Sequence, residues 1–198
     1  MTAPAPPAAP TASRTVALAD PTATAALAAR LAPALAAGTV VWLVGDLGTG
    51  KTTLVRGLLR SLGHTGTVKS PTFTLLEPYN LPRFPVYHFD FYRFSSPDEW
   101  RDAGFDEYFR GDGACLVEWP ELAGPALPGP DLRITLGFDD ARRGAGTASG
   151  VDASDDDDDD DGDGDGDGDG EHGCARIARL DAYGDAGLRC LNAAVAAS

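Results

Sequence analysis

The stretch that decides the fold is residues 45–52, GDLGTGKT, which matches the pattern GxxxxGK[ST] at every position. Directly before it, residues 39–44 (TVVWLV) form a short apolar run rich in β-branched side chains, as in a strand buried on both faces. Directly after it, residues 52–62 place their leucines on one side and are followed by Gly63, which is typical of an amphipathic helix. A glycine-rich turn between a strand and a helix predicts a phosphate-binding loop.

Each position of this loop has a physical role. Glycines permit the turn in which successive backbone N–H groups surround phosphates, and the positive end of the following helix points at the same charge. We expect the Lys51 ammonium to reach the β- and γ-phosphates and the Thr52 hydroxyl to bind Mg²⁺. The residues expected to bind the nucleotide are therefore Gly45, Asp46, Leu47, Gly48, Thr49, Gly50, Lys51, Thr52 and Thr53.

A phosphate-binding loop needs a second anchor for the metal, commonly an acid at the end of an apolar strand. Asp90 follows residues 86–89 (VYHF), and Glu118 follows residues 114–117 (ACLV). From the residues we predict that Thr52 and Asp90 bind the metal, and that Lys51, Asp90 and Glu118 are catalytic. The residue after Asp90 is Phe91 rather than the water-orienting glutamate of many ATPases. Whether Glu118 binds metal or positions water stays open.

The identity of the base follows from a missing motif. A GTPase normally carries an Asn-Lys-x-Asp segment, but the two asparagines, Asn80 and Asn192, are not followed by Lys. The sequence therefore favours ATP, with Mg²⁺, as the cofactor.

The remaining pattern alternates strands and helices. Asp20-Pro21 is typical of a helix start, and residues 22–37 carry leucines every fourth position, interrupted by Pro33. Strands are predicted at residues 86–91, 114–118, 132–136 and 175–180, and helices near Trp100 and at residues 185–197. The fold class predicted is α/β, a P-loop NTPase fold.

The length of 198 residues suits one domain. Residues 1–14 are rich in Pro and Ala and are expected to be a disordered tail, and residues 15–198 a single P-loop ATPase domain. Within it, residues 139–173 have almost no apolar content and are expected to be a disordered acidic insert. Thirteen of the 30 acidic residues lie between Asp152 and Glu171, and the other 17 nearly balance 16 Lys and Arg, so the formal charge of −14 belongs to one segment.

Composition also excludes several classes. The chain has two lysines and no clustered basic run, so unaided binding of nucleic acid is not expected. Three cysteines without CxxC spacing argue against a disulfide framework or zinc site and suggest a reducing cytosol. No apolar run approaches the ~20 residues of a membrane span. We therefore expect a cytoplasmic protein without membrane contact.

Four segments together resemble the bacterial TsaE (YjeE) family, small ATPases needed for threonylcarbamoyladenosine modification of tRNA. They are residues 45–53 (GDLGTGKTT), 70–75 (SPTFTL), 87–93 (YHFDFYR) and 117–121 (VEWPE), in this order. The resemblance implies a mixed, partly antiparallel sheet flanked by helices and weak intrinsic ATPase activity. It also implies action with a TsaB–TsaD pair, contact with tRNA only through that pair, and a monomer when alone.

The resemblance also implies that Thr52, Asp90 and Glu118 together surround the metal. Three further residues are carried over by position. The resemblance implies that Thr72 lies in a switch-like segment near the γ-phosphate, and that Thr24 and Arg142 flank the nucleotide. Trp119 is expected to fill the core, with a partner contact as the alternative, and His88 to be a packed strand residue rather than a base.

Two other functions stay open on the residues alone. One is a small-molecule or nucleoside kinase, for which Arg142-Arg143 is the only pair suited to an arginine-rich lid. The other is a nucleotide-gated binding module in which hydrolysis hardly matters.

Overall fold

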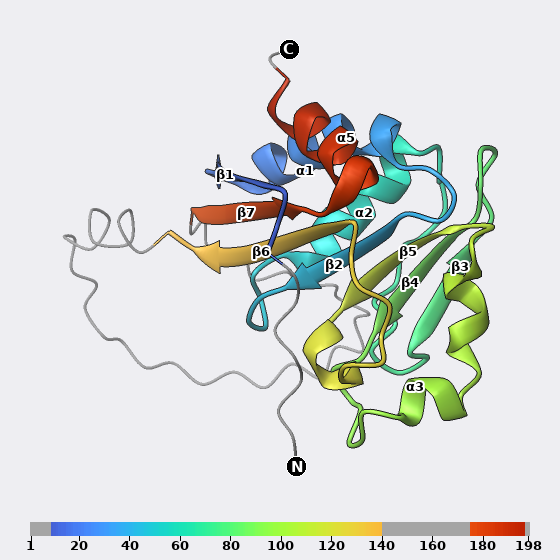
Figure 1. The fold of residues 1–198 in the computed structure, drawn as a ribbon. Helices are drawn as coiled ribbons and strands as arrows, with labels where there is room; N and C mark the ends of the chain where they lie inside the picture. The colour runs from blue at the N-terminus through green and yellow to red at the C-terminus, as the bar shows by residue number, and fades with distance from the viewer. Residues whose placement is uncertain (1–8, 140–174, 197–198) are drawn as a thin grey trace, which may run out of the picture.

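The apolar run before the glycine-rich turn forms β2 (Val40–Val44), the central strand of a seven-stranded sheet (Figure 1). The structure, a computed structural model, describes residues 9–139 and 175–196. Within them the strand order is β1-β7-β6-β2-β5-β4-β3. The other strands are β1 (Ala12–Leu18), β3 (Leu76–Tyr79), β4 (Val86–Asp90), β5 (Ala114–Glu118), β6 (Leu132–Phe138) and β7 (Arg176–Ala182).

The sheet is mixed, as predicted. The four inner strands β6, β2, β5 and β4 run parallel, whereas β7 and β1 at one side and β3 at the other join antiparallel. Because parallel strands end at the same edge, the residues that follow β2, β4 and β5 are brought together there. This edge carries the glycine-rich loop, Asp90 and Glu118.

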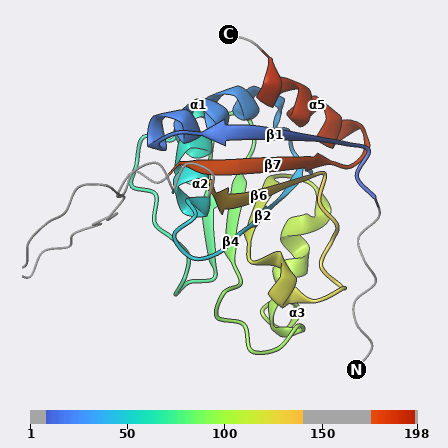
Figure 2. The ribbon, with the colours of Figure 1, turned by 90° about the vertical axis from the view of Figure 1, so that its left-hand side faces the viewer.

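Three helices cover one face of the sheet, as Figures 1 and 2 show: α1 (Pro21–Leu31), α2 (Lys51–Ser61) and α5 (Gly184–Val195). The α1 helix begins at Asp20, whose carboxylate accepts a hydrogen bond from the Ala23 N–H, and passes into a 3₁₀ turn η1 (Ala32–Ala34) at Pro33. Leu27, Leu54 and Leu58 are buried in the core beneath these helices. Their burial fixes α2, and hence the loop before it, against the sheet.

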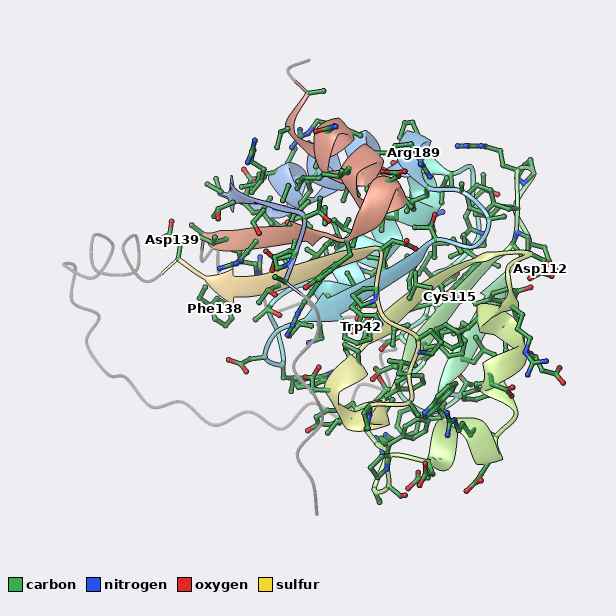
Figure 3. All side chains as sticks on the ribbon, viewed as in Figure 1. Trp42, Asp112, Cys115, Phe138, Asp139 and Arg189 are labelled. Atoms are coloured by element: carbon green, nitrogen blue, oxygen red, sulfur yellow. The ribbon has the colours of Figure 1, made fainter. Side chains whose placement is uncertain are left out.

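Short helices cover the other face over β4 and β5: α3 (Glu99–Asp102), η2 (Phe105–Arg110) and η3 (Pro120–Ala123). The core there is aromatic, with Phe89, Phe91 and Trp100 fully buried. Cys115 belongs to this cluster and Trp42 packs against it, and both labelled side chains lie on this side of the sheet in Figure 3. Since β5 is buried on both faces, its uninterrupted apolar sequence is explained.

One expectation needs correction. Residues 12–14, assigned to a disordered tail, belong to β1, which pairs with β7 over seven positions; Ser13 Oγ lies 2.5 Å from the Asp181 carboxylate. The strand depends on a partner 158 to 170 residues away, and local composition carries no sign of that pairing. The helix expected near Trp100 is present as the four-residue α3, and Glu99 accepts the Ser96 N–H as a capping box requires.

The acidic insert lies outside the described residues except at its first position. Asp139 donates its N–H to the Ala175 carbonyl at 2.8 Å, so the ends of β6 and β7 are joined there (Figure 3). The expected tail at residues 1–8 lies outside them as well. Of the helices in the described part of the chain, none is long and apolar enough to cross a membrane.

Candidate functional site

A cavity of about 300 Å³ opens at the edge where the parallel strands end. Residues from the phosphate-binding loop, the two strand ends and β7 line it. They are Leu47, Gly48, Gly50, Lys51, Thr52, Thr53, Ser70, Thr72, Asp90, Tyr92, Glu118, Trp119 and Arg176.

The loop takes a conformation that glycine makes possible. Gly45 has φ of 143°, and a Cβ there would stand 2.3 Å from the Leu136 carbonyl oxygen, so no larger residue fits. Gly50, with φ of 95°, begins α2, and no side chain caps that helix end. The first N–H groups of α2 therefore face the cavity without a side-chain acceptor, and such groups suit a phosphate.

Lys51 holds the loop together from inside. Its Nζ donates to the carbonyl oxygens of Gly45 (2.8 Å) and Asp46 (3.0 Å), and lies 4.2 Å from the centroid of the Trp119 ring. Burial lowers the pKa of this ammonium, against the opposing effect of the Glu118 and Asp90 carboxylates. Because burial makes the charged form of Lys51 unfavourable, an anionic ligand in the cavity would stabilise that charged form.

The two predicted carboxylates are neighbours across the sheet, because Asp90 of β4 and Glu118 of β5 are register partners. Both are nearly fully buried. Thr52 Oγ1 donates to Glu118 Oε1 at 3.0 Å, and His88 Nε2 lies 2.9 Å from the same oxygen. The threonine expected to bind the metal thus already contacts an expected metal carboxylate.

Asp90 is linked to the switch-like segment. Its Oδ2 accepts the Thr72 hydroxyl at 3.1 Å, and its Oδ1 accepts the Tyr92 N–H at 2.9 Å. Burial raises the pKa of Asp90, and nearby Glu118 adds to this effect, whereas the Tyr92 and Thr72 hydrogen bonds oppose it. Two buried carboxylates this close to each other favour a cation between or beside them.

The donor set fits magnesium. It offers one threonine hydroxyl and two carboxylates, which are hard oxygen ligands. Among the described residues there is no cluster of three or more His, Cys, Asp or Glu side chains that could hold a metal. Magnesium characteristically binds one or two carboxylates together with substrate phosphates and water, so the set agrees with Mg²⁺ bound alongside a nucleotide.

Most of the predicted residues that the structure describes come together. Leu47, Gly48, Gly50, Lys51, Thr52 and Thr53 of the loop line the cavity with Thr72, Asp90 and Glu118, whereas Gly45, Asp46 and Thr49 of the loop do not. Thr24 does not line the cavity. Its side chain on α1 is buried, with 3% of the residue exposed, and its hydroxyl is directed at the Asp20 carbonyl. Arg142 lies outside the described residues.

Sequence reasoning missed part of the lining. Trp119, expected in the core, is half-buried and packs against the aromatic core, but it also lines the cavity and has φ of 56°, a conformation rare outside glycine. Arg176 lines it from β7, with Nη2 3.5 Å from the Gly48 carbonyl oxygen. The sequence did contain a signal for Arg176. Because side chains in a strand alternate between the two faces, Arg176 lies on the same face of β7 as the buried Ala178 and Leu180, which is the face covered by the helices. Ser70 and Tyr92 complete the missed residues.

Comparison with known proteins agrees with this geometry. Residues 18–145, more than half of the chain, match the model of the family described as "Threonylcarbamoyl adenosine biosynthesis protein TsaE". A TsaE protein of Haemophilus influenzae is 49% identical over 104 residues, which are 52% of this chain and 66% of the relative. A TsaE protein of Bacillus subtilis is 45% identical over 133 residues, 66% of this chain and 83% of the relative.

A solved structure supports the same assignment. The crystal structure of Bacillus subtilis YdiB superposes with a TM-score of 0.62 and 30% sequence identity, and the match covers 92% of this chain and 94% of that one. The family match, the curated relatives and the shared fold agree. This chain belongs to the TsaE family of threonylcarbamoyl adenosine biosynthesis proteins.

Proposed function

We propose that this chain is a Mg²⁺-dependent ATPase that serves threonylcarbamoyladenosine biosynthesis in tRNA. The observation that carries the proposal is the contact of Thr52 Oγ1 with the Glu118 carboxylate at the mouth of a glycine-rich loop. Asp90 lies beside Glu118 on the next strand. A threonine hydroxyl, two acids and a loop lysine are the parts by which phosphate-binding loops hold a nucleotide with its magnesium.

The residues divide the work by chemistry. The α2 N-terminus and the loop amides bind the phosphates, and Lys51 leaves its carbonyl partners for the β- and γ-phosphate oxygens. Thr52, with Asp90 and Glu118, would hold Mg²⁺, which neutralises charge that develops on the phosphates. Arg176, above the loop, adds a second cation near the same charge. Thr72 connects the γ-phosphate region to Asp90 through its hydroxyl.

We expect hydrolysis to be weak in the isolated chain. Asp90 and Glu118 are the only carboxylates among the described residues that line the cavity. Each already has two hydrogen-bonding partners, Thr72 and Tyr92 on one, Thr52 and His88 on the other. A carboxylate held in this way is poorly placed to orient an attacking water as well. Family membership supports a TsaB–TsaD pair as the partner that completes the site, with tRNA contacted only indirectly.

No observation on the described residues favours the alternative function, a small-molecule or nucleoside kinase. It depends on a lid built from Arg142 and Arg143, which lie outside the described residues, and family membership favours the modification pathway.

Reconstitution tests the proposal. Phosphate release from Mg²⁺-ATP is measured for the chain alone, with TsaB–TsaD, and with substrate tRNA, while modified tRNA is counted over many turnovers. We expect stimulation by the pair and a requirement for this chain in multiple turnovers. Absence of stimulation, together with transfer of phosphate to a small acceptor, contradicts the proposal and supports a kinase.

A further inference from the structure

The charges of the chain are divided between a strongly acidic and a basic region. Residues 152–171 contain 13 acidic side chains and no Lys or Arg, and they lie outside the described residues. We call them the acidic segment. Residues 51–85, by contrast, contain five Lys or Arg and a single acid, Glu77. A search for what each region contacts therefore starts with the other.

Three of the cations gather beside Tyr79 of β3. Arg56 and Arg60 lie on the same face of α2, because residues four apart in a helix share a face. Arg60 Nη1 donates to the His64 carbonyl oxygen at 3.3 Å, and the His64 ring lies 5.0 Å from the Tyr79 ring. Burial raises the pKa of Tyr79, and the Lys69 N–H and the Arg56 charge oppose that effect, so these two residues are close to it as well. We call Arg56, Arg60 and Lys69 the basic band.

The elements around the basic band offer it no acidic partner. Neither α1 nor η1, which pack against α2, contains an acidic side chain. Within the described ranges, no acid forms an ion pair with Arg60 or Lys69. The acids on or next to these elements already accept hydrogen bonds from other groups: Asp20 from the Ala23 N–H, Glu77 from the Thr74 hydroxyl and Asp112 from the Tyr87 hydroxyl.

The acidic segment is joined to the sheet next to the start of α2. Arg176, the first residue of β7, follows the segment by five positions. A Cβ at Gly50, the N-cap of α2, would stand 3.7 Å from Arg176 Nε. Because an α-helix rises 1.5 Å per residue, Arg60 is ~15 Å further along α2. Asp161 precedes Arg176 by 15 residues, which extend to at most ~50 Å, so its carboxylate is within reach of the whole band.

Charge favours this occupant over others. A second copy of the chain brings the same formal charge of −14, and RNA brings its phosphates, so the acidic segment opposes the approach of both. The segment itself is tethered, which corresponds to an effective concentration on the order of millimolar. A single exposed ion pair contributes little. Thirteen carboxylates within 20 residues, however, offer many equivalent partners to three cations.

We propose that the acidic segment lies against the basic band of the same chain and keeps other polyanions, such as the phosphates of RNA, away from it. The proposal rests on the position of the band beside Tyr79 and on the point where the segment joins β7. It does not depend on the proposed function.

Carbodiimide coupling tests the contact, because this reagent joins an amine to a touching carboxylate through an amide bond. Lys69 is exposed, whereas Lys51, the other lysine, is buried. The full chain is coupled at low salt and in ~1 M salt, where the screening length is ~3 Å. Mass spectrometry then counts the peptides in which Lys69 is joined to residues 152–171.

One variant and one matched control accompany this measurement. Arg60→Glu reverses one charge of the basic band. Arg101→Glu makes the same change at an exposed position of α3, on the opposite face of the sheet. Thermal unfolding of both variants confirms that they fold. An equal mixture of ¹⁵N-labelled and unlabelled chains shows whether each amide forms within one chain or between two.

We expect Lys69 to be coupled to the acidic segment within one chain in wild type and in Arg101→Glu, and the yield to fall about fivefold or more in Arg60→Glu and at high salt. Absence of this amide in wild type overturns the proposal, and so does an equal loss in both variants. Amides that join labelled to unlabelled peptides assign the segment to a second copy and overturn it as well.

RNA binding tests the consequence. In one variant all seven residues from Asp155 to Asp161 are replaced by Ser, and its affinity for tRNA at low salt is compared with that of wild type. We expect the variant to bind about tenfold more tightly, and this gain to disappear when Arg60→Glu is added but not when Arg101→Glu is added. Equal affinity of wild type and the Ser variant contradicts the shielding of the basic band.

Discussion

His88 Nε2 lies 2.9 Å from Glu118 Oε1, the same oxygen that accepts the Thr52 hydroxyl at 3.0 Å. His88 is completely buried on β4, one strand away from Glu118 on β5. The His88 imidazole does not line the cavity, but it fixes the orientation of the Glu118 carboxylate, which does. This arrangement resembles the outer contacts that orient metal ligands in other proteins.

Replacing His88 should slow the hydrolysis of ATP more than it weakens the binding of ATP. In His88→Leu the Glu118 carboxylate loses one of its partners, and we expect the hydrolysis rate to fall about 10- to 100-fold, the usual effect of losing an orienting contact. His88→Gln can donate a hydrogen bond from a similar position and should retain more activity. The measurements are single-turnover phosphate release and ATP affinity. Equal rates in wild type and His88→Leu would contradict the orienting role.

Lys51→Ala should abolish hydrolysis and weaken ATP binding, because the loop loses the ammonium that Gly45 and Asp46 hold at the cavity. Lys69→Ala is the matched control, since it removes the other lysine of the chain from an exposed position. ATP affinity of the two isolated variants, measured by calorimetry, should fall only for Lys51→Ala. Unchanged ATP turnover in Lys51→Ala would remove the phosphate-loop argument.

Two loop glycines should differ in what they tolerate. A Cβ at Gly45 would meet the Leu136 carbonyl oxygen at 2.3 Å, whereas a Cβ at Gly48 would meet nothing within 4 Å. Both have positive φ, so Gly48→Ala should cost only the ~1–2 kcal/mol of that backbone conformation. Gly45→Ala adds a collision of ~1–3 kcal/mol. Denaturant unfolding measures both; equal losses would mean that the close contact is relieved without cost.

Buried thiols should make stability fall at alkaline pH. Burial raises the pKa of Cys115 to about 12 and that of Cys190 to about 11, from 9.0. Between pH 9 and 11 the unfolded chain has therefore lost protons that the folded chain keeps, so the free energy of unfolding decreases as pH rises. Unfolding by urea across this window measures the slope. Cys115→Ala should make the slope less steep, and an unchanged slope would contradict the assignment.

The inner sheet could be predicted from the sequence because its strands are continuous apolar runs bounded by polar residues. Residues 114–117 are buried, as are residues 86–89 apart from the half-buried Tyr87, and the acids that follow them end at one edge once the strands are parallel. Local pattern and tertiary structure agree there. The meeting of Asp90, Glu118 and the loop therefore followed from the positions of three strand ends.

The outer parts of the fold depend on partners distant in the sequence. The strand β1 is stabilised by β7, and its Pro- and Ala-rich neighbourhood indicated only a tail. Arg176 reaches the loop because β7 returns antiparallel to β6 after residues 140–174. Trp119 packs against the aromatic core as its side chain suits, and it also lies 4.2 Å from Lys51 Nζ, with a positive φ that local sequence did not indicate. The alternation along β7 indicated on which face Arg176 lies, but no local pattern indicated that β7 would bring it to the loop.

The most direct test of the account is phosphate release from ATP already bound to the chain, in wild type and in Glu118→Gln, at saturating Mg²⁺. If Thr52, Asp90 and Glu118 form the catalytic metal site, the variant releases phosphate far more slowly while the ATP remains bound. Release at the wild-type rate would contradict the assignment of Glu118, and with it the claim that this cavity hydrolyses ATP through the acids at the ends of β4 and β5.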